Sequence, residues 1–238
     1  MVVIAWLALA LALLAAGCSP DSGSAPRAVR PPGEIWADDI PVAHTPAGGY
    51  GLSFPAPVLA RCSEPLATGA PDLRGIWKTL RAEREGQPLP AGHALYAYVE
   101  RIEQCGDRIV DMGGGTIADA RADGSVARGV HDVSVFDYAT PIRVVASYEN
   151  GVFVLRPLLF PAIPLTIPAV KVTRRLDAEG HMVWTRPDLF HQVVTLERIG
   201  SATDAYTRQD TGRPDGGPPP GTPLWRYKLR VLWAFLTA

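Results

Sequence analysis

The sequence predicts an all-β protein folded as an up-and-down antiparallel β-barrel, with a short C-terminal helix after it. From Asp72 to about residue 200, short runs alternate apolar and polar residues, as half-buried strands do. Turn signals such as Asp123-Gly124 and Asn150-Gly151 separate these runs. The same region has no long helical periodicity, and successive antiparallel strands without crossovers close most easily as an up-and-down barrel.

Strand-length segments follow one another with short connections, several of which contain glycine. We expect strands at residues 73–82, 94–104, 107–112, 115–120, 126–136, 142–149, 152–157, 167–176, 181–186 and 190–199. Prolines between residues 35 and 71 argue against a central strand or a long helix there. We therefore expect residues 35–71 to lie over the barrel without regular structure.

Composition limits the partners. The chain has 238 residues, enough for one domain of ordinary size with appendages. Its 23 basic and 24 acidic residues give a net charge of −1. Nothing in this balance suggests a polyanion such as nucleic acid as a partner.

The first 17 residues predict an export signal. Met1–Gly17 is uncharged and apolar, with the length of a signal-peptide core. It ends in Leu14-Ala15-Ala16-Gly17-Cys18, which resembles the lipobox of bacterial lipoproteins, although no Lys or Arg precedes it. The resemblance implies that Cys18 becomes the lipid-modified (palmitate-type) N-terminus, anchored on the outer face of a membrane in the cell envelope. In a diderm bacterium this is the periplasmic side. A buried apolar helix is the alternative.

Two cysteines remain, Cys62 and Cys105, and in an oxidising compartment such a pair tends to form a disulfide. Two buried, unpaired thiols are the alternative. The expected organisation is a signal peptide at 1–17, a lipid anchor and proline-rich tether at 18–71, the barrel at 72–200, and a linker with an amphipathic segment at 201–238.

Three residues carry a family resemblance. Gly75-x-Trp77 on the first strand, a long meander, and Arg198 near the end of the last strand are similar to the lipocalin and wider calycin superfamily. The resemblance implies that Trp77 plugs the closed end of the barrel and that Arg198 packs across it, a favourable cation–π arrangement. It also implies a small hydrophobic ligand. The alternative is a core tryptophan in another β-sandwich.

Familiar catalytic motifs are missing from the sequence, and no two histidines have the spacing of metal ligands. We expect no cofactor. Residue type and strand placement predict five candidate ligand-binding residues, Tyr96, Tyr98, His131, Tyr148 and His191. A haem bound through His191 is less favoured, because Lys78-Thr79-Leu80-Arg81 stands where small haem-binding barrels have a glycine-rich motif.

Two apolar stretches remain. Residues 157–170 carry no charge and a proline every three or four residues, which predicts an extended flap at the barrel mouth or a segment packed outside it. Residues 224–236 form an amphipathic pattern flanked by Arg and Lys, which favours an interfacial helix over an edge strand.

The leading hypothesis is a membrane-anchored envelope lipoprotein whose barrel binds or carries a small hydrophobic ligand. The alternative is a protein-interaction or structural module whose barrel is filled by its own side chains. An enzyme on this barrel is less favoured. It would need converging His, Asp or Glu side chains with shifted pKa values.

Overall fold

The computed structural model describes residues 31–43, 54–113, 116–132, 142–158, 171–186 and 191–206. The chain divides into two compact units, residues 1–34 and residues 35–238, and all strands belong to the second. Cys18, most of the expected flap (residues 159–170) and the expected C-terminal helix (residues 224–236) lie outside the described residues.

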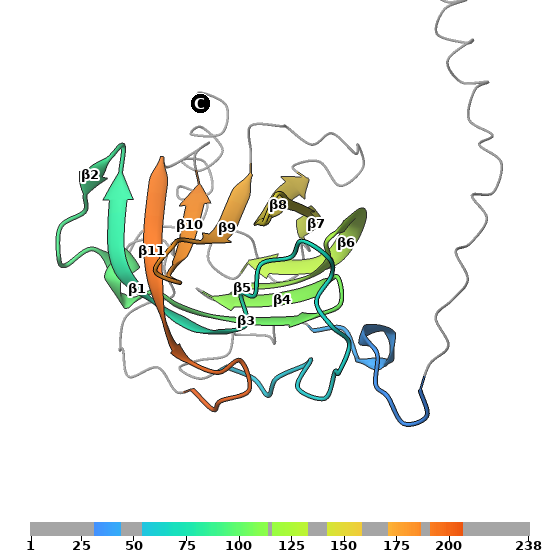
Figure 1. The fold of residues 1–238 in the computed structure, drawn as a ribbon. Helices are drawn as coiled ribbons and strands as arrows, with labels where there is room; N and C mark the ends of the chain where they lie inside the picture. The colour runs from blue at the N-terminus through green and yellow to red at the C-terminus, as the bar shows by residue number, and fades with distance from the viewer. Residues whose placement is uncertain are drawn as a thin grey trace, which may run out of the picture. The chain divides into compact units, whose positions relative to one another are not determined.

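The strands form a single antiparallel sheet that closes on itself (Figure 1). The 11 strands are β1 (Gly75–Arg84), β2 (Gln87–Pro88), β3 (Val99–Cys105), β4 (Arg108–Gly113), β5 (Thr116–Arg121), β6 (Asp123–Asp132), β7 (Ile142–Glu149), β8 (Val152–Leu158), β9 (Val172–Leu176), β10 (Met182–Arg186) and β11 (Gln192–Gly200). From β3 to β11 each strand pairs with the next in sequence. β1 pairs with both β3 and β11, while β2 only extends β1 at the rim. The predicted all-β, up-and-down antiparallel barrel is therefore confirmed.

The closing seam between β1 and β11 is long, and it places Trp77 opposite Arg198 and Arg84 opposite Gln192. A register shift at Leu80, which is exposed, bends the seam as β-bulges do. By contrast, the described residues of β5 and β6 are paired at Thr116–Asp132 and Ile117–His131 alone.

The tight turn predicted from Asn150-Gly151 is confirmed, whereas Asp123 and Gly124, also expected to form a turn, lie inside β6, where Gly124 has a φ of 83°. Asn150 and Gly151, between β7 and β8, have φ angles of 53° and 77°. Positive φ at both central residues is the geometry of the hairpin turn that Asn-Gly favours, because its twist matches that of the flanking strands.

One expected strand begins in the wrong place. Residues 94–98 do not extend β3, because Ala94–Ala97 form a 3₁₀ turn, η2, and the strand starts at Val99. His93 Nδ1 accepts a hydrogen bond from the backbone N–H of Leu95, which satisfies one donor at the start of this turn. A local side-chain cap therefore prevails over the apolar pattern of residues 94–98.

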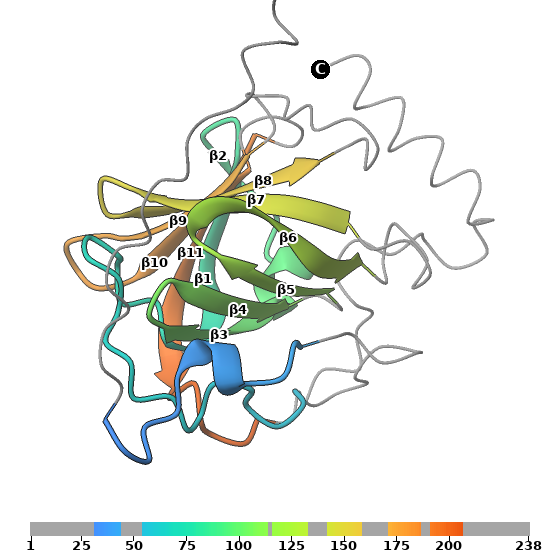
Figure 2. The same cartoon turned by 90° about the vertical axis from the view of Figure 1, so that its right-hand side faces the viewer.

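The sheet is buried on both faces along β3 and β4, where every residue is shielded from solvent. The inner face belongs to the main core, which includes Leu73, Trp77, Ile102, Ile109, Ala120, Phe153, Met182, Trp184 and Leu196. The outer face packs against residues 37–43 and 54–62 through a second cluster that contains Ala37, Ala43, Leu59, Val110, Met112 and Ile117. In Figure 2 the blue segment around Ala37–Asp39 lies beside β3.

Buried polar groups fasten this outer layer to the sheet. Arg108 of β4 forms a two-point ion pair with Asp119 of β5 and donates to the carbonyls of Ala37, Ile40 and Pro41. Cys62 and Cys105 form a disulfide, with Cα atoms 6.1 Å apart, that ties the layer to the end of β3. The expectation that residues 35–71 drape over the barrel agrees with their described part, apart from a short 3₁₀ turn, η1 (Ala37–Asp39).

Within the part of the chain that the structure describes, no helix has the length and apolar character needed to cross a membrane.

Candidate functional site

An ion cluster lies inside the barrel. Arg174 of β9 reaches carboxylates on β3 and β4, strands that are distant from β9 in the sheet order (Figures 1 and 2). Its Nη2 atom lies 2.8 Å from Glu100 Oε2 and 2.6 Å from Asp111 Oδ2. Its Nε donates to Glu100 Oε1 at 3.3 Å. A contact between strands so far apart in the sheet has to cross the barrel interior.

Tyr98 completes this cluster from just before β3. Its hydroxyl donates to Glu100 Oε2 at 2.9 Å, and its ring stacks on Trp184 of β10 with centroids 5.7 Å apart. Gly113 of β4 makes room for this arrangement, because a Cβ there would lie 2.5 Å from the Tyr98 hydroxyl oxygen. The position of Tyr98 therefore depends on a glycine on the neighbouring strand.

Burial changes the protonation of the Asp111 carboxyl. Loss of solvent raises its pKa from 3.8 to about 8, and Glu100 adds to this effect, while Arg174 opposes it. Burial lowers the pKa of Arg174, but Asp111 and Glu100 outweigh this and raise it overall. At neutral pH the cluster thus combines a charged guanidinium with a protonated Asp111, while Glu100 accepts hydrogen bonds from Tyr98 and Arg174.

Two hydrogen-bond donors of this region lack an acceptor. Arg174 Nη1 and Trp184 Nε1 are both buried, and neither has a partner among the residues that the structure describes. Arg174 and Trp184 face each other across the β9–β10 ladder, so their side chains project from the same side of the sheet. A buried donor without an acceptor costs about 1–3 kcal/mol, so two on neighbouring strands call for a physical explanation.

Much of the surrounding wall is made of small side chains. Inward positions of the middle strands carry alanines, namely Ala118 and Ala120 of β5, Ala127 of β6 and Ala146 of β7. Ala82 of β1 belongs to the same core. An eight-stranded barrel is just wide enough for side chains to fill or for one small ligand, and a larger strand number widens it. The wall is therefore thin along β5 to β7, while larger side chains such as Phe153, Met182 and Trp184 belong to the same core.

The floor of the cluster is formed by Trp77, which lies opposite Glu100 on the neighbouring strand. Trp77 Nε1 donates to the carbonyl of Leu73 at 2.7 Å, and the guanidinium of Arg198 lies 4.7 Å from the Trp77 ring centroid. Gly75 has a φ of 151°, and a Cβ at this position would lie 3.0 Å from Arg198 Cγ. The three residues that carried the family resemblance are thus in mutual contact at one end of the barrel.

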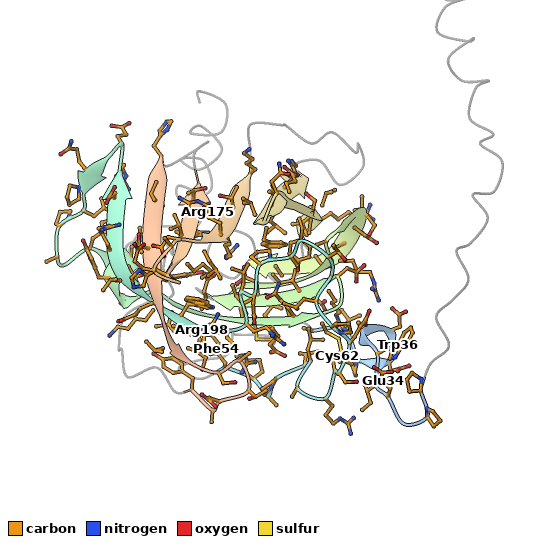
Figure 3. All side chains as sticks on the ribbon, in the orientation of Figure 1. Glu34, Trp36, Phe54, Cys62, Arg175 and Arg198 are labelled. Carbon is orange, nitrogen blue, oxygen red and sulfur yellow. A yellow bond between two sulfur atoms is a disulfide. The ribbon has the colours of Figure 1, made fainter. Side chains whose placement is uncertain are left out.

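A separate pocket of about 580 Å³ lies outside this floor, where Figure 3 labels Arg198 and Phe54. Leu59, Asp72, Arg74, Glu103, Gln104 and Arg198 are among the residues that line it. Its polar groups are already engaged by the chain itself. Gln104 bonds the Leu73 N–H, the Pro71 carbonyl and the Tyr148 hydroxyl, and Arg198 donates to the Asp72 carbonyl. These contacts hold the end of the barrel together, so the interior cluster is the better candidate site.

The five predicted ligand-binding residues lie in different places. Tyr98 belongs to the ion cluster. Tyr148 lines the inner core near Phe153 and accepts from Gln104, and the Tyr96 hydroxyl donates to the Leu89 carbonyl. His131 pairs with Ile117 at the end of β6, and its side chain is outside the described residues. His191 is exposed just before β11, where its carbonyl accepts from the Glu85 N–H.

Two groups of side chains in the described ranges bring enough potential ligand atoms together for a metal ion. The first contains Cys62 and Cys105, whose sulfurs are joined to each other. The second lies in the β9–β10 turn, where Asp177 accepts hydrogen bonds from the backbone N–H groups of Glu179 and His181. Both groups therefore already have a structural role, and the absence of a metal stays a prediction.

Sequence reasoning missed four residues of the site, Glu100, Asp111, Arg174 and Trp184. Strand alternation was the available signal, since Glu100 shares a strand face with Ile102 and Asp111 shares one with Ile109. On β3, however, charged residues occupy both faces, and all are buried. The pattern could not show which of them point inward.

Comparison with known proteins adds little. No family model and no curated protein matches the sequence. Among solved structures, the chain is similar to "REP1-NXSQ fatty acid transporter", with 13% sequence identity and a TM-score of 0.33. The match covers 54% of this chain and 96% of the other. A likeness this distant carries no weight for function, which has to be inferred from the residues themselves.

Proposed function

We propose that this protein is an envelope lipoprotein whose barrel binds and carries a small, mostly apolar molecule. The observation that carries the proposal is the pair of buried donors, Arg174 Nη1 and Trp184 Nε1, side by side on the inner face of an apolar barrel. A ligand with an acceptor at one end would satisfy both donors, and its apolar part would lie along the alanine-rich wall. Burial of that part favours binding by about 25 cal/mol per Å².

The proposed location at a membrane of the cell envelope is inferred from the sequence. Cys18 would carry the lipid and hold the barrel at a membrane, with no nucleic acid or other polyanion as partner. The Cys62–Cys105 disulfide supports an oxidising compartment, since disulfides persist outside the reducing cytosol. A carrier placed there would take up a poorly soluble molecule at one membrane surface and shield it from water.

The enzyme hypothesis deserves comparison, because Glu100 and Asp111 are converging carboxyls and the pKa of Asp111 is raised. Arg174 and Tyr98 occupy three of their four oxygens, however. Glu100 Oε2 accepts from both Tyr98 and Arg174, and Asp111 Oδ2 pairs with Arg174. Among the described residues of this cluster, the buried atoms left without a partner are donors, whereas a general base would need a free acceptor. The geometry therefore favours binding over acid–base chemistry.

The first test is chemical. Protein purified from its native host is denatured and extracted with organic solvent, and the extract is analysed by mass spectrometry. We expect one lipophilic compound in a near-stoichiometric amount. A well-folded sample that yields an empty extract would favour the alternative, an interaction module with a filled barrel.

A pair of variants separates these two functions without knowledge of the ligand. Ala146→Phe adds a ring to a fully buried inward position of β7, and Val145→Phe adds the same ring to the outer face. In a hollow barrel, Ala146→Phe should abolish uptake of the neutral fluorophore N-phenyl-1-naphthylamine and leave stability nearly unchanged, while Val145→Phe keeps uptake. In a filled barrel, Ala146→Phe should lower the free energy of unfolding by about 1–3 kcal/mol through overpacking.

A further inference from the structure

The chemistry of the ion cluster also bears on which end group the ligand carries. Buried arginines commonly bind carboxylates, and one would expect an acidic ligand here. Arg174, however, already has two carboxyl partners, Glu100 at 2.8 Å and Asp111 at 2.6 Å. Its positive charge is therefore balanced from within the chain.

Resting on the proposed function, we infer that the polar end of the ligand is an uncharged oxygen acceptor, such as a ketone, ester or amide carbonyl, held by Arg174 Nη1 and Trp184 Nε1. Both donors are on the same face of neighbouring strands, and both are buried. One carbonyl oxygen has two lone pairs and accepts two donors at once. A hydrocarbon end would leave both donors unsatisfied.

Charge excludes the acidic end group. A ligand carboxylate beside Arg174 would be a third carboxyl group around one guanidinium, in a region with little water to screen it. Charges of the same sign repel strongly in such surroundings. The raised pKa of Asp111 agrees with this, since burial above all, and Glu100 in addition, disfavour the charged form of that carboxyl.

Trp184 adds a neutral donor. An indole N–H forms hydrogen bonds as a donor only and carries no charge, so it selects for an acceptor without selecting for an anion. Its ring is held in place by stacking on Tyr98, 5.7 Å between centroids, and Tyr98 is in turn fixed by Glu100. The donor is therefore rigidly placed before any ligand arrives.

The test uses one tail with different end groups. Decan-2-one, decanoate and decane compete at pH 7 with N-phenyl-1-naphthylamine for the full-length protein. We expect decan-2-one to displace the fluorophore at a concentration about 10-fold or more below that of decane, since it satisfies donors that would otherwise stay unpaired. Decanoate should be weaker than decan-2-one. The inference is wrong if decanoate displaces the fluorophore at the lowest concentration. It is also wrong if the displacing concentrations of the three compounds simply follow their hydrophobicity.

A variant pair tests the role of Trp184. Trp184→Phe removes the N–H and keeps an aromatic ring on Tyr98, whereas Trp36→Phe makes the same change in the outer layer. Trp184→Phe should weaken decan-2-one binding about 2- to 10-fold and leave decane unaffected, and Trp36→Phe should change neither. Equal affinities for decan-2-one in Trp184→Phe and in the unaltered protein would overturn the inference. Failure of every variant and of the unaltered protein to bind the fluorophore would instead overturn the proposed function on which it rests.

Discussion

Arg174 Nη2 of β9 lies 2.6 Å from Asp111 Oδ2 of β4, a contact across the inside of the barrel between strands that are not neighbours in the sheet. Taking both groups out of water offsets much of the attraction between them. It also places a titratable group in the core. The pair therefore makes the stability of the fold depend on pH.

The first prediction concerns Asp111. Its pKa is about 8 in the folded protein and about 3.8 when exposed, so between these values the folded state holds a proton that the unfolded chain releases. Stability should therefore fall as pH rises from about 4 to about 8, by up to about 1.4 kcal/mol per pH unit, and level off above. Urea unfolding at a series of pH values measures this. The side chain of Asp111→Asn stays neutral, so this variant should lose the decrease in stability between about pH 4 and about pH 8 that Asp111 causes. The same dependence of stability on pH in the variant and the unaltered protein would contradict the raised pKa of Asp111.

The second prediction concerns Gly75. Gly75→Ala should lower the free energy of unfolding by about 1–3 kcal/mol, because the new Cβ would lie 3.0 Å from Arg198 Cγ at a backbone φ of 151°. Chemical denaturation provides the measurement. Gly92→Ala is the matched control, since no atom lies within 4 Å of its Cβ position, and it should have little effect. Equal effects of the two changes would mean that the contact with Arg198 does not constrain Gly75.

The third prediction concerns the disulfide. Cys62 and Cys105 are 43 residues apart in the chain. Replacing both by alanine should reduce the free energy of unfolding by about 4 kcal/mol in the chain-entropy model, because the unfolded chain gains freedom. Dithiothreitol should destabilise the unaltered protein by a similar amount and have no effect on the double variant. A reducing agent that leaves the unaltered protein unchanged would show that the bridge contributes little.

The fourth prediction concerns the outer layer. Arg108→Met leaves Asp119 buried without its cation and frees three backbone carbonyls, so it should destabilise the protein by about 3–5 kcal/mol. Limited proteolysis should then cut near residues 37–43 first. Arg121→Met removes two more exposed ion pairs on the same face, those with Asp38 and Asp107, and should cost at most about 1 kcal/mol for each. Equal protease resistance of the two variants would refute the role given to Arg108.

The order of strands could be predicted because its signals are local. Alternation of apolar and polar residues needs only neighbours in the chain, and turns such as Asn150-Gly151 are set by the φ angles that two residues adopt. Connections too short for a crossover then leave an antiparallel meander as the simplest topology. The error at residues 94–98 is also local in origin, since the cap from His93 gives no apolar signal.

The candidate site could not be predicted, because it is formed by contacts between residues that lie far apart in the sequence. Alternation of apolar and polar residues distinguishes the two faces of a strand only when one face is exposed to solvent. The outer layer held by Arg108 leaves β3 and β4 buried on both faces. Glu100, Arg101 and Glu103 therefore look alike in sequence. Tertiary structure alone decided that Glu100 meets Arg174, because that pairing joins residues 74 positions apart, and only closure of the barrel brings them within hydrogen-bonding distance.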